Sequence, residues 1–284
     1  MFYFRFIFSC GLALLLAACG SNITPVTGVT LANFRYTGAA GVLTVKLVGE
    51  ALTASGVRVY ANGASCQNDN STSETNRSAY CVLTIPDNLK VAIRVANSSN
   101  EDNFNAVFTA PMPQVRFTTR IGNAASSEDF VIELNPISAP ITVKNFLAYV
   151  NESPSFYEST IFHRVDKSAG VVQGGGFTAG TVAKTGLKAS IALESNNGLL
   201  NLRGSVGMAR TTDVNSATSQ FYINMRDNPL YNYTSDSNPG YAVFGSVISG
   251  MSTLENIYNQ ETHLIANVSA PINDITIISA SQTQ

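Results

Sequence analysis

The sequence has few of the residues on which enzyme chemistry most often depends. Its 284 residues include no tryptophan, two histidines and only 13% charged side chains, with a formal net charge of -2. Without an excess of positive charge, the chain has no electrostatic basis for binding nucleic acid. His163 and His263 lie far apart and have no cysteine or carboxylate at ligand spacing beside them, which argues against a metal site.

Motifs for nucleophilic and phosphate chemistry are absent as well. The sequence has no Gly-x-Ser-x-Gly, and the three glycines at 174–176 lack the Lys-Ser/Thr pair that a phosphate-binding loop needs. A hydrolase or a nucleotide-dependent enzyme therefore has little support, and we expect no cofactor and no metal.

The N-terminus predicts export. Arg5 precedes an apolar run, Phe6–Leu16, that is too short to span a bilayer comfortably, and small residues follow the run. This pattern is typical of a signal peptide over residues 1–19. The segment at 16–20, Leu-Ala-Ala-Cys-Gly, also resembles the bacterial lipobox, in which the cysteine is lipidated and becomes the new N-terminus. The alternative is an ordinary signal peptide in which Cys19 is incidental.

Lipidation of Cys19 would place the protein at a membrane, because two or more acyl chains hold a protein stably at a bilayer surface. Gly20 and Ser21, rather than an aspartate, follow the cysteine. Similarity to enterobacterial lipoproteins then favours the outer membrane of a bacterial cell envelope, on the periplasmic side.

The two cysteines outside this leader predict a disulfide. Cys66 and Cys81 have neither Cys-x-x-Cys spacing nor a histidine nearby, so a metal or catalytic role is not indicated. In an oxidising compartment such a pair is most simply a disulfide. Closing a loop of about 15 residues stabilises a fold by roughly 3 kcal/mol in the chain-entropy model.

Residues 29–112 are predicted to form a β module after a tether at 20–28. Short runs rich in Val, Ile, Thr and Tyr, without helical periodicity, are separated by turn residues. They lie at 41–49, 55–61, 79–86, 90–97 and 105–111. Strands at this spacing favour a β-sandwich. The segment loosely resembles the immunoglobulin-like modules of bacterial surface proteins, without their buried tryptophan, and we expect a spacer or docking role.

Residues 113–284 are predicted to form a second, larger domain. Strand-like runs at 115–122 and 129–136 precede a helix from Pro140, in which apolar residues recur at i, i+3, i+4 and i+7. Strands and long polar loops follow, with a second helix near Met251–Tyr258. This order predicts a mainly β fold: a closed antiparallel barrel capped by two helices.

Five motifs occur in this second part, in a fixed order and at defined separations. They are Phe162-His-Arg-Val165, Gln173-Gly-Gly-Gly-Phe177, Gly204-Ser-Val-Gly-Met-Ala-Arg210, Ser216-Ala-Thr-Ser-Gln-Phe-Tyr-Ile-Asn224 and Gly240-Tyr-Ala-Val-Phe-Gly245. Together they strongly resemble the cyclophilin-type peptidyl-prolyl cis-trans isomerases, particularly the bacterial periplasmic branch. The resemblance runs from about Val115 to Ile278.

The resemblance implies a site that binds a proline-containing peptide. Arg164 would be the catalytic donor and Gln173 would orient the substrate backbone. Met208, Tyr222 and Leu230 would line the proline pocket, and the backbone of Ala209 and Arg210 would hold the residues before the proline. The remaining substrate-binding residues would be Phe162, Val171, Gln220 and Tyr241.

Strand alternation in the sequence is compatible with such a site. Side chains two residues apart in a strand face the same side. Alternation predicts that one wall presents Phe162, Arg164, Val171, Gln173, Gln220 and Tyr222, with Val165, Phe221 and Ile223 in the interior. This wall has a cation, amides and apolar surface but no nucleophile, which suits rotation about an X-Pro bond, because that reaction breaks no covalent bond.

Without the family resemblance, the residues themselves also allow simpler structural interpretations. Arg164 could be a structural ion-pair partner, and Gln220 could satisfy a loop. His163 is better explained as a framework histidine than as a proton carrier. The three glycines are expected to allow close backbone approach or positive φ.

Several positions depart from the best-known family members. The segment between Arg164 and Gln173 is one residue longer than usual, with Gly170 where an aromatic residue lines the pocket and Val171 where methionine is common. Leu230 stands at a Trp or Phe position and Tyr241 at a His position. Loss of an aromatic wall removes about 1–3 kcal/mol of ring burial.

These departures leave two functions open. The first is an envelope-anchored isomerase that acts on proline-containing or unfolded client proteins, as a monomer. The second is a catalytically weak or inactive peptide-binding protein of the same shape. Retention of Arg164 and Gln173 favours the isomerase, whereas Gly170 and Leu230 favour the binding protein.

Overall fold

The computed structural model describes residues 26–37, 42–50, 52, 54–68, 78–84 and 88–284. The predicted signal peptide, the lipobox with Cys19 and the tether up to residue 25 lie outside the described residues. No helix in the described part of the chain is long and apolar enough to cross a membrane.

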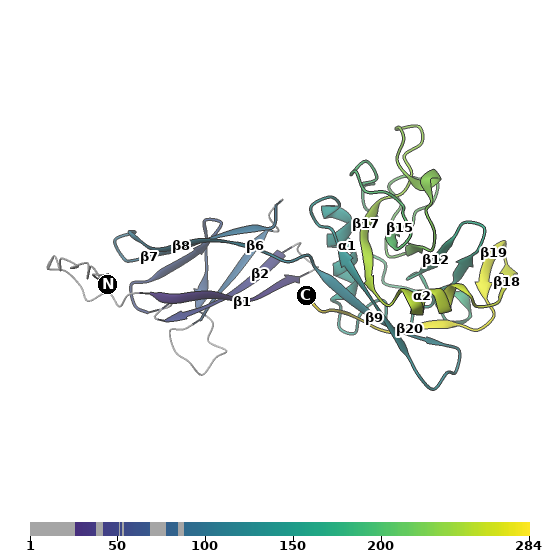
Figure 1. Ribbon diagram of the computed structural model, residues 1–284, viewed down its shortest axis with the longest axis horizontal. Helices are drawn as coiled ribbons and strands as arrows, with labels where there is room; N and C mark the ends of the chain where they lie inside the picture. The colour runs from purple at the N-terminus through teal and green to yellow at the C-terminus, as the bar shows by residue number, and fades with distance from the viewer. Residues whose placement is uncertain (1–25, 38–41, 51, 53, 69–77, 85–87) are drawn as a thin grey trace, which may run out of the picture.

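The N-terminal region consists of two four-stranded antiparallel sheets (Figure 1). The first has the order β1-β2-β6-β5 and the second the order β4-β3-β7-β8. Their bounds are β1 Thr27–Thr37, β2 Val42–Glu50, β3 Arg58–Ala61, β4 Ala64–Ser65, β5 Gln67–Asn68, β6 Ser78–Thr84, β7 Lys90–Ala96 and β8 Asp102–Thr109. The predicted strands are thus present, and β1 was not foreseen as a strand.

The alternating sequence pattern explains why these strands form sheets with one buried face. In β7, Val91, Ile93 and Val95 are buried while Lys90 and Ala92 are exposed. β6 follows the same alternation, with Cys81 and Leu83 among its buried residues. Most buried apolar residues of both sheets belong to a hydrophobic cluster that continues into the core of the C-terminal region.

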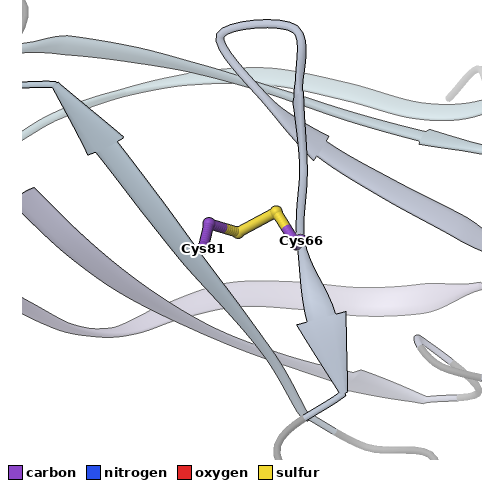
Figure 2. The surroundings of a disulfide bond; sticks show 2 residues. All are labelled: Cys66 and Cys81. Atoms are coloured by element: carbon purple, nitrogen blue, oxygen red, sulfur yellow. A yellow bond between two sulfur atoms is a disulfide. The ribbon is translucent and has the colours of Figure 1, made fainter.

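The predicted disulfide between Cys66 and Cys81 is confirmed, with an S–S distance of 2.05 Å (Figure 2). Cys66 lies between β4 of one sheet and β5 of the other, at the point where the chain crosses between the sheets. Because Gln67 is opposite Tyr80 in the β5–β6 pair, Cys66 stands opposite Cys81. The disulfide therefore fixes this crossing to β6.

The C-terminal region contains an eight-stranded antiparallel sheet with the order β11-β12-β16-β15-β17-β10-β9-β20. Two short two-stranded sheets, β13-β14 and β18-β19, flank it. The bounds are β9 Gln114–Ile121, β10 Glu128–Leu134, β11 Arg164–Asp166, β12 Val171–Gly174, β13 Phe177–Thr178, β14 Val182–Ala183, β15 Ser205–Met208, β16 Phe221–Asn224, β17 Val243–Ser249, β18 Thr262–Ile265, β19 Val268–Pro271 and β20 Ile275–Gln282.

The prediction of a closed barrel is wrong for the described strands. The sheet is curled but open, and its edge strands β11 and β20 do not form a ladder with each other. The segment just before β11 instead reaches β20 through an isolated bridge between Ile161 and Thr276, with backbone bonds such as Phe162 N to Ile275 O at 2.9 Å. These bonds end at Phe162, two residues before β11 begins, so the two edge strands share no ladder.

The two predicted helices are confirmed as α1, Pro140–Val150, and α2, Met251–Tyr258; the short 3-10 turns are η2, Ala179–Thr181, and η3, Pro229–Tyr231. α1 begins with a proline, which the first turn tolerates. Glu194, far away in sequence, accepts bonds from the free backbone N–H groups of Ile141 and Thr142 at 3.0 and 2.7 Å. A carboxylate at this end of a helix satisfies these donors and suits the helix dipole.

An aromatic cluster fills the space between the curled sheet and α1. Phe146 of α1 lies 5.5 Å from the ring of Phe221 and 5.0 Å from that of Phe244. Phe117 and Phe130 stack at 5.0 Å, and all five rings are fully buried. This core holds β9, β10, β16 and β17 in place, and β16 contributes to the candidate site on its other face.

Candidate functional site

Three predicted site residues lie side by side across three neighbouring strands. Arg164 on β11 is directly opposite Gln173 on β12, and Gln173 is directly opposite Tyr222 on β16. Residues that are directly opposite in antiparallel strands project from the same face. The structure therefore brings Arg164, Gln173 and Tyr222 together in a single row, which we call the register row.

Hydrogen bonds connect the polar members of this face. The Arg164 guanidinium donates through Nη1 to Gln173 Oε1 at 3.3 Å, and Gln173 Nε2 donates to Gln220 Oε1 at 3.0 Å. Gly176 permits this arrangement, because a Cβ there would lie 2.5 Å from Gln220 Cγ. The two glutamines are thus oriented by the arginine rather than free to rotate.

Asp166 is a site residue that the sequence argument missed. It lies two residues after Arg164 on β11, on the same face, and accepts a bond from Arg164 Nη2 at 2.7 Å. Its other oxygen accepts bonds from the Ser168 hydroxyl and the Ala169 N–H. Burial opposes ionisation of Asp166, but these bonds and the charge of Arg164 outweigh it and lower its pKa.

A group of three tyrosine rings stands at the other end of the register row. Tyr222 lies 5.9 Å from both Tyr231 and Tyr241, nearly perpendicular to each, and Tyr231 and Tyr241 are 5.1 Å apart. Tyr231 is the second residue that sequence reasoning missed. We call these rings the tyrosine cluster.

The Tyr222 ring is fixed from two directions. Gly207 lies opposite it on β15, where a Cβ would come within 2.2 Å of the ring, so only glycine leaves room for it. The Tyr222 hydroxyl donates to Asn201 Oδ1 at 2.6 Å, and Asn201 is itself buried. Burial, with the neighbouring tyrosines adding to it, raises the pKa of Tyr222 well above its ordinary value, so the hydroxyl stays neutral.

Ala209 and Arg210 follow β15 beside the tyrosine cluster. The Arg210 guanidinium lies 4.7 Å from the centre of the Tyr241 ring and donates to the Gly240 carbonyl at 2.7 Å. The Ala209 N–H donates to Gln220 O at 3.0 Å, so that donor is already used within the protein. Arg210 is thereby held on the Tyr241 side of the cluster.

Two residues assigned to substrate binding lie in the core instead. Phe162 is fully buried, with its ring 6.2 Å from Phe130 and 6.0 Å from Phe221. The strand begins only at Arg164, so alternation does not extend back to Phe162. Met208 is opposite Phe221 on β15, one residue away from the Gly207–Tyr222 row, and therefore faces the interior.

Leu230 is placed differently from the prediction. Its side chain is 87% exposed on η3, whereas the adjacent Tyr231 is the residue whose ring meets Tyr222. A 3-10 turn rotates successive residues, so the aromatic contact falls one position later than the motif suggested. Val171 is buried on the same strand face as Gln173 and lies outside the main core cluster.

His163 lies beside Arg164 but faces away from the site. Its ring packs against Phe177 at 4.6 Å and is 7% exposed, and its Nδ1 has no hydrogen-bond partner among the described residues. Burial, with the charge of Arg164 adding to it, lowers the pKa of His163 to about 4. The ring is therefore neutral at ordinary pH and buried away from the register row.

The segment Lys167–Gly170 forms the edge of the site next to Asp166. Gly170 has a φ of 68°, and a Cβ there would lie 2.6 Å from Arg226 Cγ and Nε. The Arg226 side chain therefore occupies the space into which a side chain at position 170 would project. The aromatic wall that the family resemblance would place here is replaced by a guanidinium and its methylene stem.

The arrangement has the chemistry of a binding and polarising site. It presents a guanidinium, two amides and three phenol rings, and neither a nucleophile nor a base lies in the register row. Among the described residues, no group of three or more His, Cys, Asp or Glu could hold a metal ion. Such a site can grip a peptide and donate a charge-assisted hydrogen bond to it.

Comparisons with known proteins agree with the family resemblance drawn from the motifs. The family model "Cyclophilin type peptidyl-prolyl cis-trans isomerase/CLD" matches residues 116–282. This match covers the C-terminal region and leaves the N-terminal sheets outside.

Two curated bacterial relatives match the same region. A peptidyl-prolyl cis-trans isomerase from Acinetobacter baylyi is 43% identical over 166 residues, covering 58% of this chain and 82% of the relative. Peptidyl-prolyl cis-trans isomerase B from Escherichia coli is 47% identical over 131 residues, covering 45% and 77%. The crystal structure of a cyclophilin-type isomerase from Cryptosporidium parvum, in the presence of the dipeptide Ala-Pro, aligns with 60% of this chain and 99% of its own, at 26% identity and a TM-score of 0.47.

Proposed function

The chain belongs to the cyclophilin-type peptidyl-prolyl cis-trans isomerase family, and we propose that it catalyses rotation about X-Pro bonds with Arg164 as the catalytic donor. The observation that supports this most is the register row, in which Arg164, Gln173 and Tyr222 share one face. Curated bacterial relatives with 43% and 47% identity are peptidyl-prolyl cis-trans isomerases. This similarity is the second reason for assigning the same activity to this chain.

Rotation about an X-Pro bond requires a group that stabilises the twisted peptide bond, and the Arg164 guanidinium can do so. Peptide-bond rotation has a barrier of about 18–20 kcal/mol, and the proline nitrogen regains its lone pair only when the bond is twisted. A guanidinium that donates to that nitrogen binds the twisted state better than either planar state, which is the requirement for catalysis. One such bond in a dry site contributes on the order of 3 kcal/mol, or about a hundredfold in rate.

The remaining residues have supporting roles in this proposal. Asp166 holds the Arg164 guanidinium in place through its 2.7 Å bond, so little ordering is needed when substrate binds. Gln173 and Gln220 would orient the substrate carbonyls, and the tyrosine cluster would receive the proline ring. Ala209 and Arg210 would lie along the residues that precede the proline.

A second candidate function is that of a weak isomerase that mainly binds peptides. The Arg164–Asp166 ion pair favours it, because a partly neutralised guanidinium polarises the proline nitrogen less. Gly170 and exposed Leu230 favour it as well, since neither supplies an aromatic wall.

Proline-limited refolding of an unfolded protein substrate decides between these functions. We expect the wild-type protein to accelerate the slow phase and Arg164→Ala to lose about a hundredfold of that acceleration. Arg116→Ala is the matched control, because Arg116 is an exposed, ion-paired arginine on β9 of the same region. A wild-type rate equal to the uncatalysed rate would leave only the binding function.

We also propose that the protein is lipidated at Cys19 and held at the bacterial envelope, favouring the outer membrane. The lipobox-like sequence supports this, and the Cys66–Cys81 disulfide suits an oxidising compartment. The two four-stranded sheets, which lie between Thr27 and Thr109, would then form an immunoglobulin-like sandwich that acts as a spacer between membrane and isomerase domain. Labelling with a fatty-acid analogue tests the anchor: incorporation should be lost in Cys19→Ser and kept in Cys10→Ser, and labelling that persists in Cys19→Ser would refute it.

A further inference from the structure

A cavity adjoins the tyrosine cluster at Tyr231. It has a volume of about 440 Å³, and its lining includes Ser168, Arg226, Asn228, Pro229, Leu230 and Tyr231. Tyr231 belongs to both this cavity and the tyrosine cluster, so the two are separated by a single ring. We call it the Arg226 cavity.

The Arg226 cavity exists because of two local features of this chain. Position 170 is a glycine with positive φ, and the Arg226 side chain lies over it. Arg226 Nη2 donates to the Ser168 carbonyl, and Nε lies 3.5 Å from Asn228 Oδ1. These bonds hold the guanidinium at the cavity wall instead of leaving it to extend into solvent.

The charge in the cavity is not balanced by an ion pair. Arg164, Arg116 and Arg203 each have a carboxylate partner. Arg226 has none in the described part of the chain, and its bonds to Ser168 and Asn228 use only two of the five N–H donors of a guanidinium. Asp227 also lines the cavity; its carboxylate accepts the backbone N–H of Arg203 at 2.8 Å, keeps its negative charge and forms no ion pair with Arg226.

The position of the cavity indicates which part of a bound peptide would reach it, namely the residues after the proline. Arg210 lies on the Tyr241 side of the tyrosine cluster, and the Arg226 cavity lies on the Tyr231 side. If the proline ring occupies the cluster and the preceding residues lie along Ala209 and Arg210, the chain after the proline leaves toward Arg226. The mouth there has an exposed apolar side chain, Leu230, beside the cation.

We propose that the Arg226 cavity is a subsite for the residue that follows the proline, and that it prefers an acidic side chain. Arg226 would bind the carboxylate, and Leu230 with Pro229 would contact the methylene groups. A planar guanidinium with free donors matches a carboxylate in a two-bond geometry. This inference rests on the proposed function for the direction of the peptide.

The test uses three peptides that differ only after the proline: X-Pro-Glu, X-Pro-Gln and X-Pro-Lys. Dissociation constants are measured by titration at low salt, and turnover is measured on the same samples. An exposed ion pair changes affinity by a small factor, so we expect wild type to prefer Glu over Gln by about threefold and Glu over Lys by about tenfold. High salt should reduce both ratios.

Charge-reversal and control variants assign the preference to one residue. Arg226→Gln should remove the preference for Glu, and Arg226→Glu should reverse it in favour of Lys. Arg226→Lys should still prefer the Glu peptide over the Lys peptide. This result would show that the loss of the preference in Arg226→Gln comes from the loss of charge and not from a folding defect. Arg203→Gln is the matched control, because Arg203 is an exposed arginine that pairs with Glu255 outside the cavity; its ratios should equal those of wild type.

The outcomes separate the subsite from the isomerase activity. Equal dissociation constants for all three peptides, or a preference that survives in Arg226→Gln, would overturn the subsite even if turnover is rapid. Absence of turnover of every peptide, with the Glu preference present in binding and lost in Arg226→Gln, would refute the isomerase function and leave the subsite standing.

Discussion

The two regions of the molecule are both built from antiparallel sheets, but their interiors differ. Residues 27–109 bury mainly aliphatic side chains such as Leu43 and Ile93, and a disulfide joins the chain crossing to β6. Residues 114–282 bury a cluster of aromatic rings around Phe146 and Phe221, around which a longer sheet curls. The candidate site lies on this curled sheet and on the loops beside it, because the strands direct Arg164, Gln173 and Tyr222 away from the ring-filled core.

This difference predicts that the buried aromatic rings around Phe221 stabilise the core and also hold the candidate site in place. Phe221→Ala removes a ring that contacts four others, and truncation of a buried Phe costs about 3–5 kcal/mol. Because Tyr222 is the next residue, we expect turnover to fall with stability. Chemical denaturation followed by amide NMR measures both regions separately. Leu47→Ala in the first region is the control: it should lower stability there and leave X-Pro turnover intact, and a loss of turnover would contradict the separation.

Protonation of a buried histidine in acid should destabilise the second region but not the first. Residues 27–109 contain no histidine, whereas the pKa of buried His163 is lowered from 6.5 to about 4. The unfolded chain therefore binds a proton that the folded chain excludes, so stability falls as pH drops from 6.5 to 4. The loss approaches about 3 kcal/mol. Denaturation midpoints at pH 7 and pH 4.5 measure it, and His163→Gln should flatten the difference. An equal pH dependence in His163→Gln would contradict this account.

Removing the disulfide should affect only the first region. In a Cys66→Ala/Cys81→Ala protein we expect residues 27–109 to lose roughly 3 kcal/mol, because the unfolded chain is no longer constrained. Hydrogen exchange of the β6 and β7 amides measures the loss. Protection of β12 and β16 should not change, and a matching decrease there would show that the two regions unfold as one unit.

The smallest effect concerns the ion pair at the edge of the site. Asp166→Asn removes a hydrogen bond between charged groups, worth about 1.5–3 kcal/mol, so we expect kcat to fall about tenfold or more while KM changes little. Ser168→Ala removes a bond to the other carboxylate oxygen and is the control. A rise in kcat in Asp166→Asn would mean that the carboxylate restrains Arg164 instead of positioning it.

The register row could be predicted from sequence because it depends on strand alternation. Arg164, Gln173 and Tyr222 belong to recognisable motifs, and short strands place such residues on one face. Phe162 was misplaced because β11 starts two residues later than the motif, so strand alternation does not extend back to it. The open sheet was missed for a similar reason: ladder length at the edges depends on a few backbone bonds.

The edge of the site could not be predicted because side-chain bonds between distant loops determine it. Arg226 lies over Gly170, more than fifty residues earlier in the chain, and no local pattern relates the two positions. Tyr231, rather than Leu230, meets Tyr222 because of the rotation of η3. Asp166 was part of an unusual linker in the sequence, but its bond to Arg164 was visible only in the structure.

Exchange spectroscopy on an X-Pro peptide tests the central claim most directly. It measures cis–trans interconversion at equilibrium, with a catalytic amount of protein and without a coupling enzyme. The account predicts exchange cross-peaks with wild-type protein and none with Arg164→Ala at the same concentration, although the variant still binds the peptide through the tyrosine cluster. Equal exchange rates with wild-type protein and with Arg164→Ala would contradict the assignment of Arg164 as the catalytic donor.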